Sequence, residues 1–206
     1  TIRDWSSDVC SSDLGPVLLN LPRNGLAAQC EVEALPAPAT TRVHSVPAGA
    51  EAQIAEAVRM LAGAERPVIV VGGGIKSTFV SDAACALAEA LHAPMVTSPG
   101  HGDAVPFGHP LNAGQMGPRG NFVASRLVRE ADVILALGSR LGFNATFYSY
   151  DNLNRDAQII QVEIEPTAIG RYFPVTLGIW GDAPEVARQM TQALGRMADR
   201  ARADTW

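Results

Sequence analysis

The chain has few of the features that mark disulfide-rich, membrane-spanning or nucleic-acid-binding proteins. Its 206 residues include only three cysteines, which lie far apart and form neither a CxxC pair nor a metal-binding spacing. We therefore expect a reducing, cytoplasmic setting. No apolar run approaches the roughly 18 residues of a membrane span. The net charge of −5, without a basic stripe, argues against nucleic acid or a membrane surface as a partner.

A starting methionine is also missing, and residues 4–14 have neither a helical nor a strand period. This stretch repeats a Ser-Ser-Asp unit, and the run from Trp5 to Asp13 matches, residue by residue, the translation of a common sequencing-adapter oligonucleotide. We interpret residues 1–14 as an artefact and exclude them from the fold; a natural polar leader is the alternative. A signal peptide is not expected, because the stretch has no basic start and no apolar core.

The next segments predict a strand and then a linker. Residues 15–24 read GPVLLNLPRN, in which a short apolar run predicts a buried strand that ends at Pro22. Residues 25–49 are enriched in alanine, proline and threonine and have no clear period. Pro36, Pro38 and Pro47 favour extended backbone, so we predict a linker.

From residue 50 onward, helical and strand patterns alternate. Helical spacing predicts helices over 50–63, 79–92, 121–130 and 184–203; in the first, Ile54, Val58 and Leu61 share one face. Apolar runs predict strands over 68–71, 94–97, 132–137, 158–164 and 175–180, and residues 99–120 resemble a long loop. This alternation predicts an α/β domain over 50–203, with a Rossmann-like parallel sheet and helices on both faces.

Glycines and charged residues follow the predicted strands. They fall in five segments, over 72–74, 97–100, 138–140, 163–165 and 181–182. In parallel sheets, ligands bind beyond the carboxyl ends of the strands, so we expect these segments to meet at one rim. Glycine N–H groups and a guanidinium suit phosphate, and carboxylates suit ribose hydroxyls, which together predict a nucleotide site.

Each of these signals also has a simpler explanation. The glycines at 72–74 do not complete a G-x-G-x-x-G motif, so they make either a phosphate cradle or a plain strand-to-helix turn. Arg140 binds phosphate or forms a surface ion pair. Glu163 and Glu165 would point the same way within a strand, where they bind ribose or remain solvated.

The sequence contains no pattern that predicts catalysis. His101 and His109 lie in the long loop without a third ligand at a defined spacing, so we expect packed loop histidines rather than a metal site. Ser98 and Ser139 lack a nucleophile-elbow context, and Cys85 falls in a predicted amphipathic helix, where it packs as a small apolar residue. We predict neither catalytic nor metal-binding residues.

Six segments, in order, resemble thiamine-diphosphate-dependent enzymes of the acetolactate synthase family. GPVLLNLPRN, over 15–24, resembles the end of their pyrimidine-binding domain. The other five resemble their central domain: RPVIVVGGGI over 66–75, TSPGHGDAVPFGHPLNAGQMGPRGN over 97–121, ADVILALGSRLG over 131–142, QIIQVEIEPTAIGR over 158–171 and LGIWGDA over 177–183. The resemblance extends over about residues 15–195.

The resemblance implies a groove in the central domain that holds FAD in acetolactate synthases and ADP, or nothing, in related enzymes. The implied groove residues are Gly73, Gly74, Gly117, Gly120, Gly138, Arg140, Glu163, Ile164, Glu165 and Asp182. Two departures count against FAD itself. An Asp-Asp-Arg run is replaced by residues 141–144, LGFN, and the usual Asp-Ile-Asp is Glu-Ile-Glu. The GSRLG and GPRG segments also resemble sulfoacetaldehyde acetyltransferases.

The resemblance further implies a parent enzyme, a homodimer or homotetramer, that joins or cleaves 2-oxo acids with thiamine diphosphate and Mg²⁺. In the family, a glutamate activates the cofactor, and a Gly-Asp-Gly…Asn segment of a C-terminal domain binds magnesium and diphosphate. Neither is found here, so we expect a fragment without catalysis of its own. The alternatives are a stand-alone nucleotide-binding module, similar to sirtuins or deoxyhypusine synthase, and a structural spacer. The strand-like run over 15–24 argues against the stand-alone module.

Overall fold

The computed structural model describes residues 20–29, 46–77 and 82–196. The chain divides into two units, over 1–43 and 44–206. In the first unit, the described residues form a single-turn helix, α1 (Arg23–Leu26), with no buried residue. Leu21, at the end of the strand predicted within residues 15–24, is exposed and lies in no strand, so the strand prediction is wrong at this residue. No strand among the described residues of this unit pairs with Leu21. Residues 15–19, the predicted artefact and most of the predicted linker lie outside the described residues.

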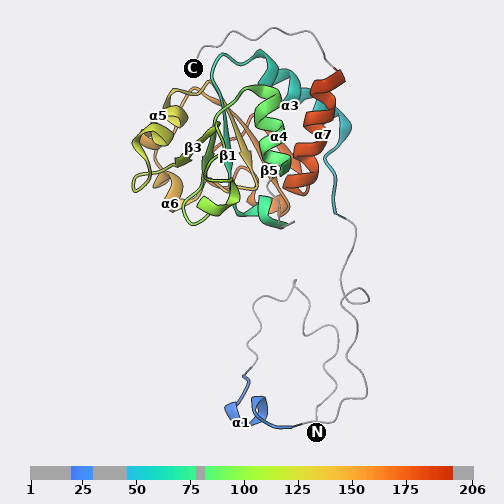
Figure 1. The fold of residues 1–206 in the computed structure, drawn as a ribbon, viewed down its shortest axis with the longest axis vertical. Coiled ribbons are helices and arrows are strands. Elements are labelled where there is room, and N and C mark those ends of the chain that lie inside the picture. Colours follow the sequence, from blue (N-terminus) through green and yellow to red (C-terminus); the bar gives the residue numbers. More distant parts are fainter. Residues whose placement is uncertain (1–19, 30–45, 78–81, 197–206) are drawn as a thin grey trace. The chain divides into compact units, whose positions relative to one another are not determined.

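The second unit is built on a six-stranded parallel sheet (Figure 1). Its strands are β1 (Pro67–Val71), β2 (Met95–Thr97), β3 (Asn112–Gln115), β4 (Val133–Leu137), β5 (Gln158–Glu163) and β6 (Leu177–Trp180). They lie in the order β3-β2-β1-β4-β5-β6, and every neighbouring pair is parallel. The order reverses between β1 and β4, as in doubly wound nucleotide-binding folds. The predicted α/β class is confirmed.

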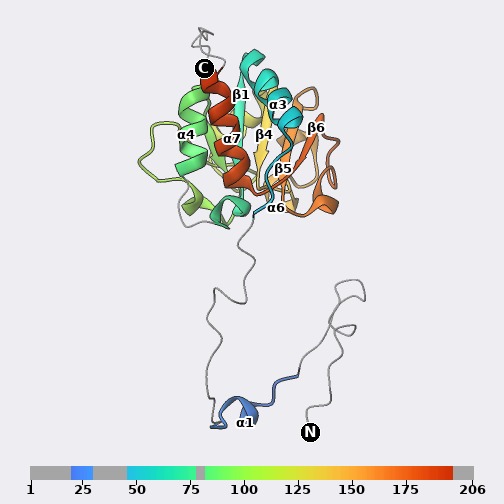
Figure 2. The same ribbon diagram turned by 90° about the vertical axis from the view of Figure 1, so that its right-hand side faces the viewer.

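The central strands are buried on both faces because helices cover both sides of the sheet. On one side, α3 (Glu51–Gly63), α4 (Asp82–Leu91) and α7 (Ala183–Arg196) pack together (Figure 2). On the other lie α5 (Phe122–Glu130) and the short α6 (Phe143–Thr146) (Figure 1). Alternate residues of β1 therefore enter two separate cores, Ile69 and Val71 on the first side, Val68 and Val70 on the second. No helix among the described residues is long and apolar enough to cross a membrane.

Part of the predicted long loop over 99–120 is a strand. β3 is the edge strand of the sheet, and all four of its residues are only partly buried. Its sequence, NAGQ, contains no β-branched or aromatic residue, so the apolar pattern gives no sign of it. Each of the five predicted strands also differs from the observed one by one or two residues at one end; β5 ends one residue early, and β6 begins at Leu177.

The end of the predicted linker is part of the domain. The backbone N–H of Gly49 donates to Gln189 Oε1 at 2.9 Å, and its carbonyl accepts from Gln189 Nε2 at 3.2 Å. The carbonyl of Pro47 accepts a hydrogen bond from the N–H of Asp182 at 2.7 Å. The domain therefore begins before residue 50, where the backbone pairs with α7 and its first turn.

Candidate functional site

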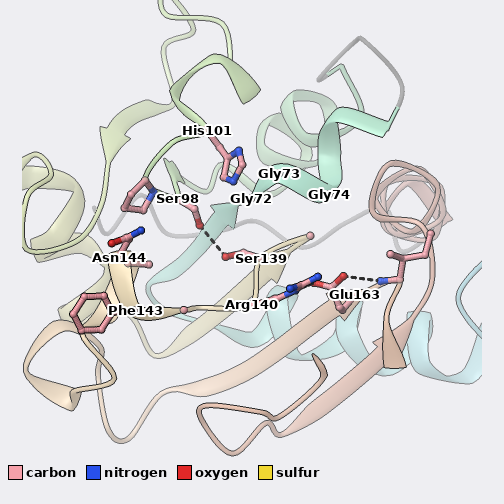
Figure 3. A pocket seen from close by; sticks show the side chains of 15 residues that line it. Gly72, Gly73, Gly74, Ser98, His101, Ser139, Arg140, Phe143, Asn144 and Glu163 are labelled. Carbon is pink, nitrogen blue, oxygen red and sulfur yellow. Dashed lines mark hydrogen bonds and ion pairs between the residues drawn. The ribbon is translucent and has the colours of Figure 1, made fainter. Parts of the chain in front are cut away.

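A cleft of about 510 Å³ opens where four parallel strands end (Figure 3). Its volume is within the roughly 300–1,000 Å³ that is usual for cofactor sites. It lies beside the ends of β1 and β4, where the strand order reverses, which is the expected ligand position in such a sheet. The lining residues are Gly72, Gly73, Gly74, Ser98, Pro99, His101, Gly138, Ser139, Arg140, Gly142, Phe143, Asn144, Ala145, Glu163 and Ile164.

The glycine loops after β1 and β4 interlock to form one side of the cleft. The N–H of Gly72 donates to the carbonyl of Leu137, and that of Gly74 donates to the carbonyl of Gly138, both at 3.0 Å. A Cβ on Gly72 would meet the carbonyl of Gly138 and come within 2.7 Å of Ser139 Cα. Gly138 itself has a left-handed backbone, with a φ of +62°. These glycines thus allow the two loops to approach closely. The N–H groups of Gly72 and Gly74 donate hydrogen bonds between the loops and are not available to a ligand.

Other hydrogen-bond donors at the cleft remain available. The backbone N–H groups of Gly73, Ser139 and Arg140 donate to no acceptor among the described residues. The side chain of Arg140 is 57% exposed, and its Nε lies 3.9 Å from Glu163 Oε2. This separation exceeds hydrogen-bond distance, so the guanidinium is held only loosely. The residues that line the cleft therefore include three with an N–H group that has no acceptor in the described part of the chain, and one of these three also has a cationic side chain.

Two hydroxyls and one imidazole also line the cleft (Figure 3). Ser98 Oγ and Ser139 Oγ lie 2.8 Å apart, and Ser139 Oγ also accepts from the N–H of Leu141 at 3.3 Å. The ring of His101 packs against Gly73, where a Cβ would be 2.6 Å from its Cε1 atom. His101 therefore lies in the cleft, a position for which its place in the sequence gave no indication.

Two other polar residues of the loop over 99–120, His109 and Asp103, form contacts outside the cleft. His109 Nε2 lies 3.1 Å from Glu89 Oε1, outside the cleft. Lys76 donates a hydrogen bond to Asp103 and thereby holds the pKa of that carboxyl below its ordinary value. Within the described ranges, no group of three His, Cys, Asp or Glu residues is arranged to hold a metal ion.

Only one of the two predicted glutamates lines the cleft. Glu163 is the last residue of β5 and is 6% exposed, with Oε1 accepting from the N–H of Ile164 at 3.1 Å. Glu165 lies beyond the strand, so the condition under which both side chains would point the same way is not met. It accepts from the N–H and Oγ1 of Thr167, at 3.1 and 2.8 Å, which lowers its pKa. Glu165 therefore caps a short turn.

Three further predicted residues lie outside the cleft lining. Asp182 directly precedes α7, and its Oδ1 accepts from the N–H of Glu185 at 3.1 Å. Gly117 has a φ of +103° and packs behind α6, because a Cβ there would be 2.9 Å from the Asn144 carbonyl. Gly120 packs against the end of β3. The six predicted residues that do line the cleft are Gly73, Gly74, Gly138, Arg140, Glu163 and Ile164.

A strained turn after β4 brings an aromatic ring to the cleft. Leu141, Phe147 and Tyr148 all have left-handed backbones, with φ values of 50°, 49° and 55°. Such angles cost energy in non-glycine residues and often occur at functional sites. The turn places Phe143, which is 52% exposed, at the cleft, with its ring stacked on Phe147 at 4.8 Å between centroids. In the sequence, this turn is marked only by four aromatic residues over 143–150, whose spacing has neither a helical nor a strand period.

Thr146 holds this turn together, so its replacement by valine is expected to lower the free energy of unfolding by about 2 kcal/mol. Its fully buried Oγ1 donates to the carbonyl of Leu141 at 3.0 Å and accepts from the N–H of Tyr148 at 3.1 Å. Valine keeps the shape but leaves both backbone groups without this partner. Urea unfolding measures the change.

Thr191→Val is the matched control. Its Oγ1 donates only to the Ala187 carbonyl within α7, at 2.9 Å. A loss below about 0.5 kcal/mol is expected there. Equal losses in the two variants would contradict the assigned role of Thr146.

A family model described as the central domain of thiamine pyrophosphate enzymes matches residues 54–190. The chain is 38% identical, over 207 residues, to a sulfoacetaldehyde acetyltransferase from Alcaligenes xylosoxydans xylosoxydans; the match covers 96% of this chain and 34% of that protein. It is 30% identical, over 186 residues, to an acetolactate synthase large subunit from Buchnera aphidicola, covering 87% and 32% of the two proteins. The chain thus spans about a third of the length of these relatives.

The fold also matches a solved structure. A protein from Mycobacterium smegmatis, assigned to the thiamin diphosphate-dependent enzymes, superposes with a TM-score of 0.62 at 20% identity. The match covers 74% of this chain and 29% of that one.

Proposed function

The chain belongs to the thiamine pyrophosphate enzymes and contains their central domain, and from this premise we propose that its cleft binds a nucleotide. The observation that carries the proposal is the placement of the donors. Three unengaged N–H groups, from Gly73, Ser139 and Arg140, and the guanidinium of Arg140 lie in a single cleft at the strand-order reversal. Such a donor set matches a diphosphate, for which arginine and backbone N–H groups are common ligands.

The residues of the cleft fit an ADP-like group. Arg140 and the backbone N–H groups would hold the diphosphate, and the Glu163 carboxylate would accept from ribose hydroxyls. Among the described residues that line the cleft, Arg140 is the only arginine or lysine, which suits one diphosphate. We favour ADP over FAD because Phe143 and Asn144 line the cleft where FAD-binding synthases resembling this chain carry charged side chains. A bound nucleotide supplies no reaction step in this proposal; it joins the loops after β1, β4 and β5.

We further propose that the domain works within a longer thiamine diphosphate- and Mg²⁺-dependent enzyme that transfers a two-carbon unit. Sulfoacetaldehyde is the favoured substrate, because the acetyltransferase is more similar to this chain than the synthase is. An acetolactate synthase activity, which joins two 2-oxo acids with loss of carbon dioxide, is the alternative. Thiamine diphosphate supplies the carbanion that makes and breaks the carbon–carbon bond. A cytoplasmic homodimer or homotetramer is the proposed assembly.

A thermal melt of the full chain with added ligands tests the nucleotide proposal. At 100 times its dissociation constant, ADP is expected to stabilise the domain by about 2.7 kcal/mol. For a domain of this size, that corresponds to a rise in Tm of roughly 5–10 °C. FAD and NAD are measured in parallel, and thiamine diphosphate with Mg²⁺ is expected to give no shift, because the Gly-Asp-Gly segment that binds it in the family is not in this sequence. If none of the nucleotides raises the Tm, only a spacer role is left for the domain.

A further inference from the structure

We propose that His101 is a ligand-binding residue that donates a hydrogen bond from Nε2 to a phosphate oxygen of the bound nucleotide; this rests on the proposed nucleotide site. The first observation is an unsatisfied atom. Among the described residues, His101 Nδ1 is the only buried side-chain nitrogen or oxygen without a hydrogen-bond partner. Such atoms are rare in folded proteins, and each calls for an explanation.

The position of the unsatisfied atom decides which ring nitrogen carries the proton. A proton on Nδ1 would be a buried N–H donor without an acceptor, which is costly. A neutral ring with its proton on Nε2 avoids that cost. Nε2 is not among the buried atoms, and it too has no partner among the described residues. In this tautomer the one donor of the ring, Nε2–H, has no acceptor among the described residues.

The surroundings of the ring indicate what Nε2–H would meet. His101 lines the cleft beside Gly73, whose backbone N–H also lacks an acceptor. A side chain on residue 73 would strike the ring, since a Cβ there would lie 3.0 Å from Nε2. The absence of a side chain at Gly73 thus lets the imidazole and a backbone donor share one edge of the cleft. Two adjacent donors fit a phosphate oxygen better than a hydroxyl. The carboxyl of Asp103 interacts electrostatically with His101, but it is paired with Lys76 and does not line the cleft.

The test compares His101→Leu, His101→Gln and His101→Asn in the full chain by calorimetric titration with ADP. Leucine removes the donor, and the expected affinity loss is about tenfold, the usual effect of losing one hydrogen bond to a charged group. The glutamine amide nitrogen reaches about as far as Nε2, so His101→Gln is expected to stay within about threefold of wild type. Asparagine reaches only as far as Nδ1 and is expected to lose affinity as leucine does.

Two further readouts separate binding from a structural role. Without ligand, His101→Leu is expected to keep or raise the Tm, because it removes an unpaired buried nitrogen. Inorganic pyrophosphate is expected to lose affinity for His101→Leu as ADP does, whereas adenosine is expected to bind both proteins equally. His109→Leu serves as the control, since that histidine pairs with Glu89 outside the cleft.

The outcomes distinguish this inference from the proposed function. If wild type binds no ADP, the nucleotide site and the role of His101 are both overturned. If wild type binds ADP and His101→Leu binds it equally well, only the role of His101 is overturned. A similar loss with adenosine, or a lowered Tm with unchanged affinity, likewise overturns the phosphate contact.

Discussion

Replacing Gly72 with alanine is expected to lower the free energy of unfolding by about 3 kcal/mol and to abolish ligand binding in the cleft. A Cβ at this position would meet the carbonyl of Gly138 and lie 2.7 Å from Ser139 Cα. These are backbone atoms at the end of a central strand, so they cannot move aside as a flexible side chain would. The loops after β1 and β4 would have to separate, which breaks the Gly74-to-Gly138 hydrogen bond.

The measurement is a thermal or urea melt, in which this loss corresponds to a fall in Tm of roughly 6–12 °C. Gly195→Ala is the matched control, because no atom lies within 4 Å of its would-be Cβ in the last turn of α7. There alanine is expected to raise stability by about 0.5–1 kcal/mol through its better helix propensity. A neutral Gly72→Ala variant would mean that the two loops are not interlocked as described.

Replacing Arg140 with methionine is expected to weaken ADP binding about 100-fold while leaving the Tm of the unliganded domain nearly unchanged. A guanidinium that binds phosphate in a bidentate manner contributes roughly 1.5–3 kcal/mol. Its ion pair with Glu163, at 3.9 Å, is too long to add much stability, and its electrostatic interaction with Glu165 involves exposed groups. This variant should therefore lose affinity for ADP without losing stability.

Two control variants sharpen the test of Arg140. Arg140→Lys keeps the charge but loses the planar fork, so an intermediate loss of about tenfold is expected. Arg126→Met removes a similarly exposed arginine, one paired with Glu130 on α5 outside the cleft, and is expected to leave ADP affinity unchanged. If Arg140→Met binds as wild type does, Arg140 is a surface residue and the diphosphate lies elsewhere.

The fold was largely predictable because the buried strands have a simple physical signature. β1 and β4 read PVIVV and VILAL, and a strand covered by helices on both faces needs apolar residues at every position. β3 reads NAGQ and is only partly buried, so no burial pattern marked it. α6 spans a single turn, which is too short for helical spacing to register.

The site was predictable only where it follows from strand ends. Gly73, Gly138, Arg140 and Glu163 each come at or directly after a strand, so topology alone brings them to the cleft. His101 comes four residues after β2, and its packing on Gly73 depends on how the intervening loop folds back.

The same limit explains why two of the predicted residues lie outside the cleft lining. Glu165 lies outside it because β5 ends at Glu163, two residues earlier. Asp182 does follow a strand, but its carboxylate caps α7 instead of facing the cleft, and the two roles leave the same sequence pattern.

Calorimetric titration of the full chain with ADP tests the account most directly, with thiamine diphosphate as a control that carries the same diphosphate group. We predict saturable binding at one site per chain for ADP, strong weakening in Arg140→Met, and no binding of thiamine diphosphate. A cooperatively folded chain that gives no binding heat and no melting shift with about 1 mM ADP, FAD or NAD would contradict the nucleotide site.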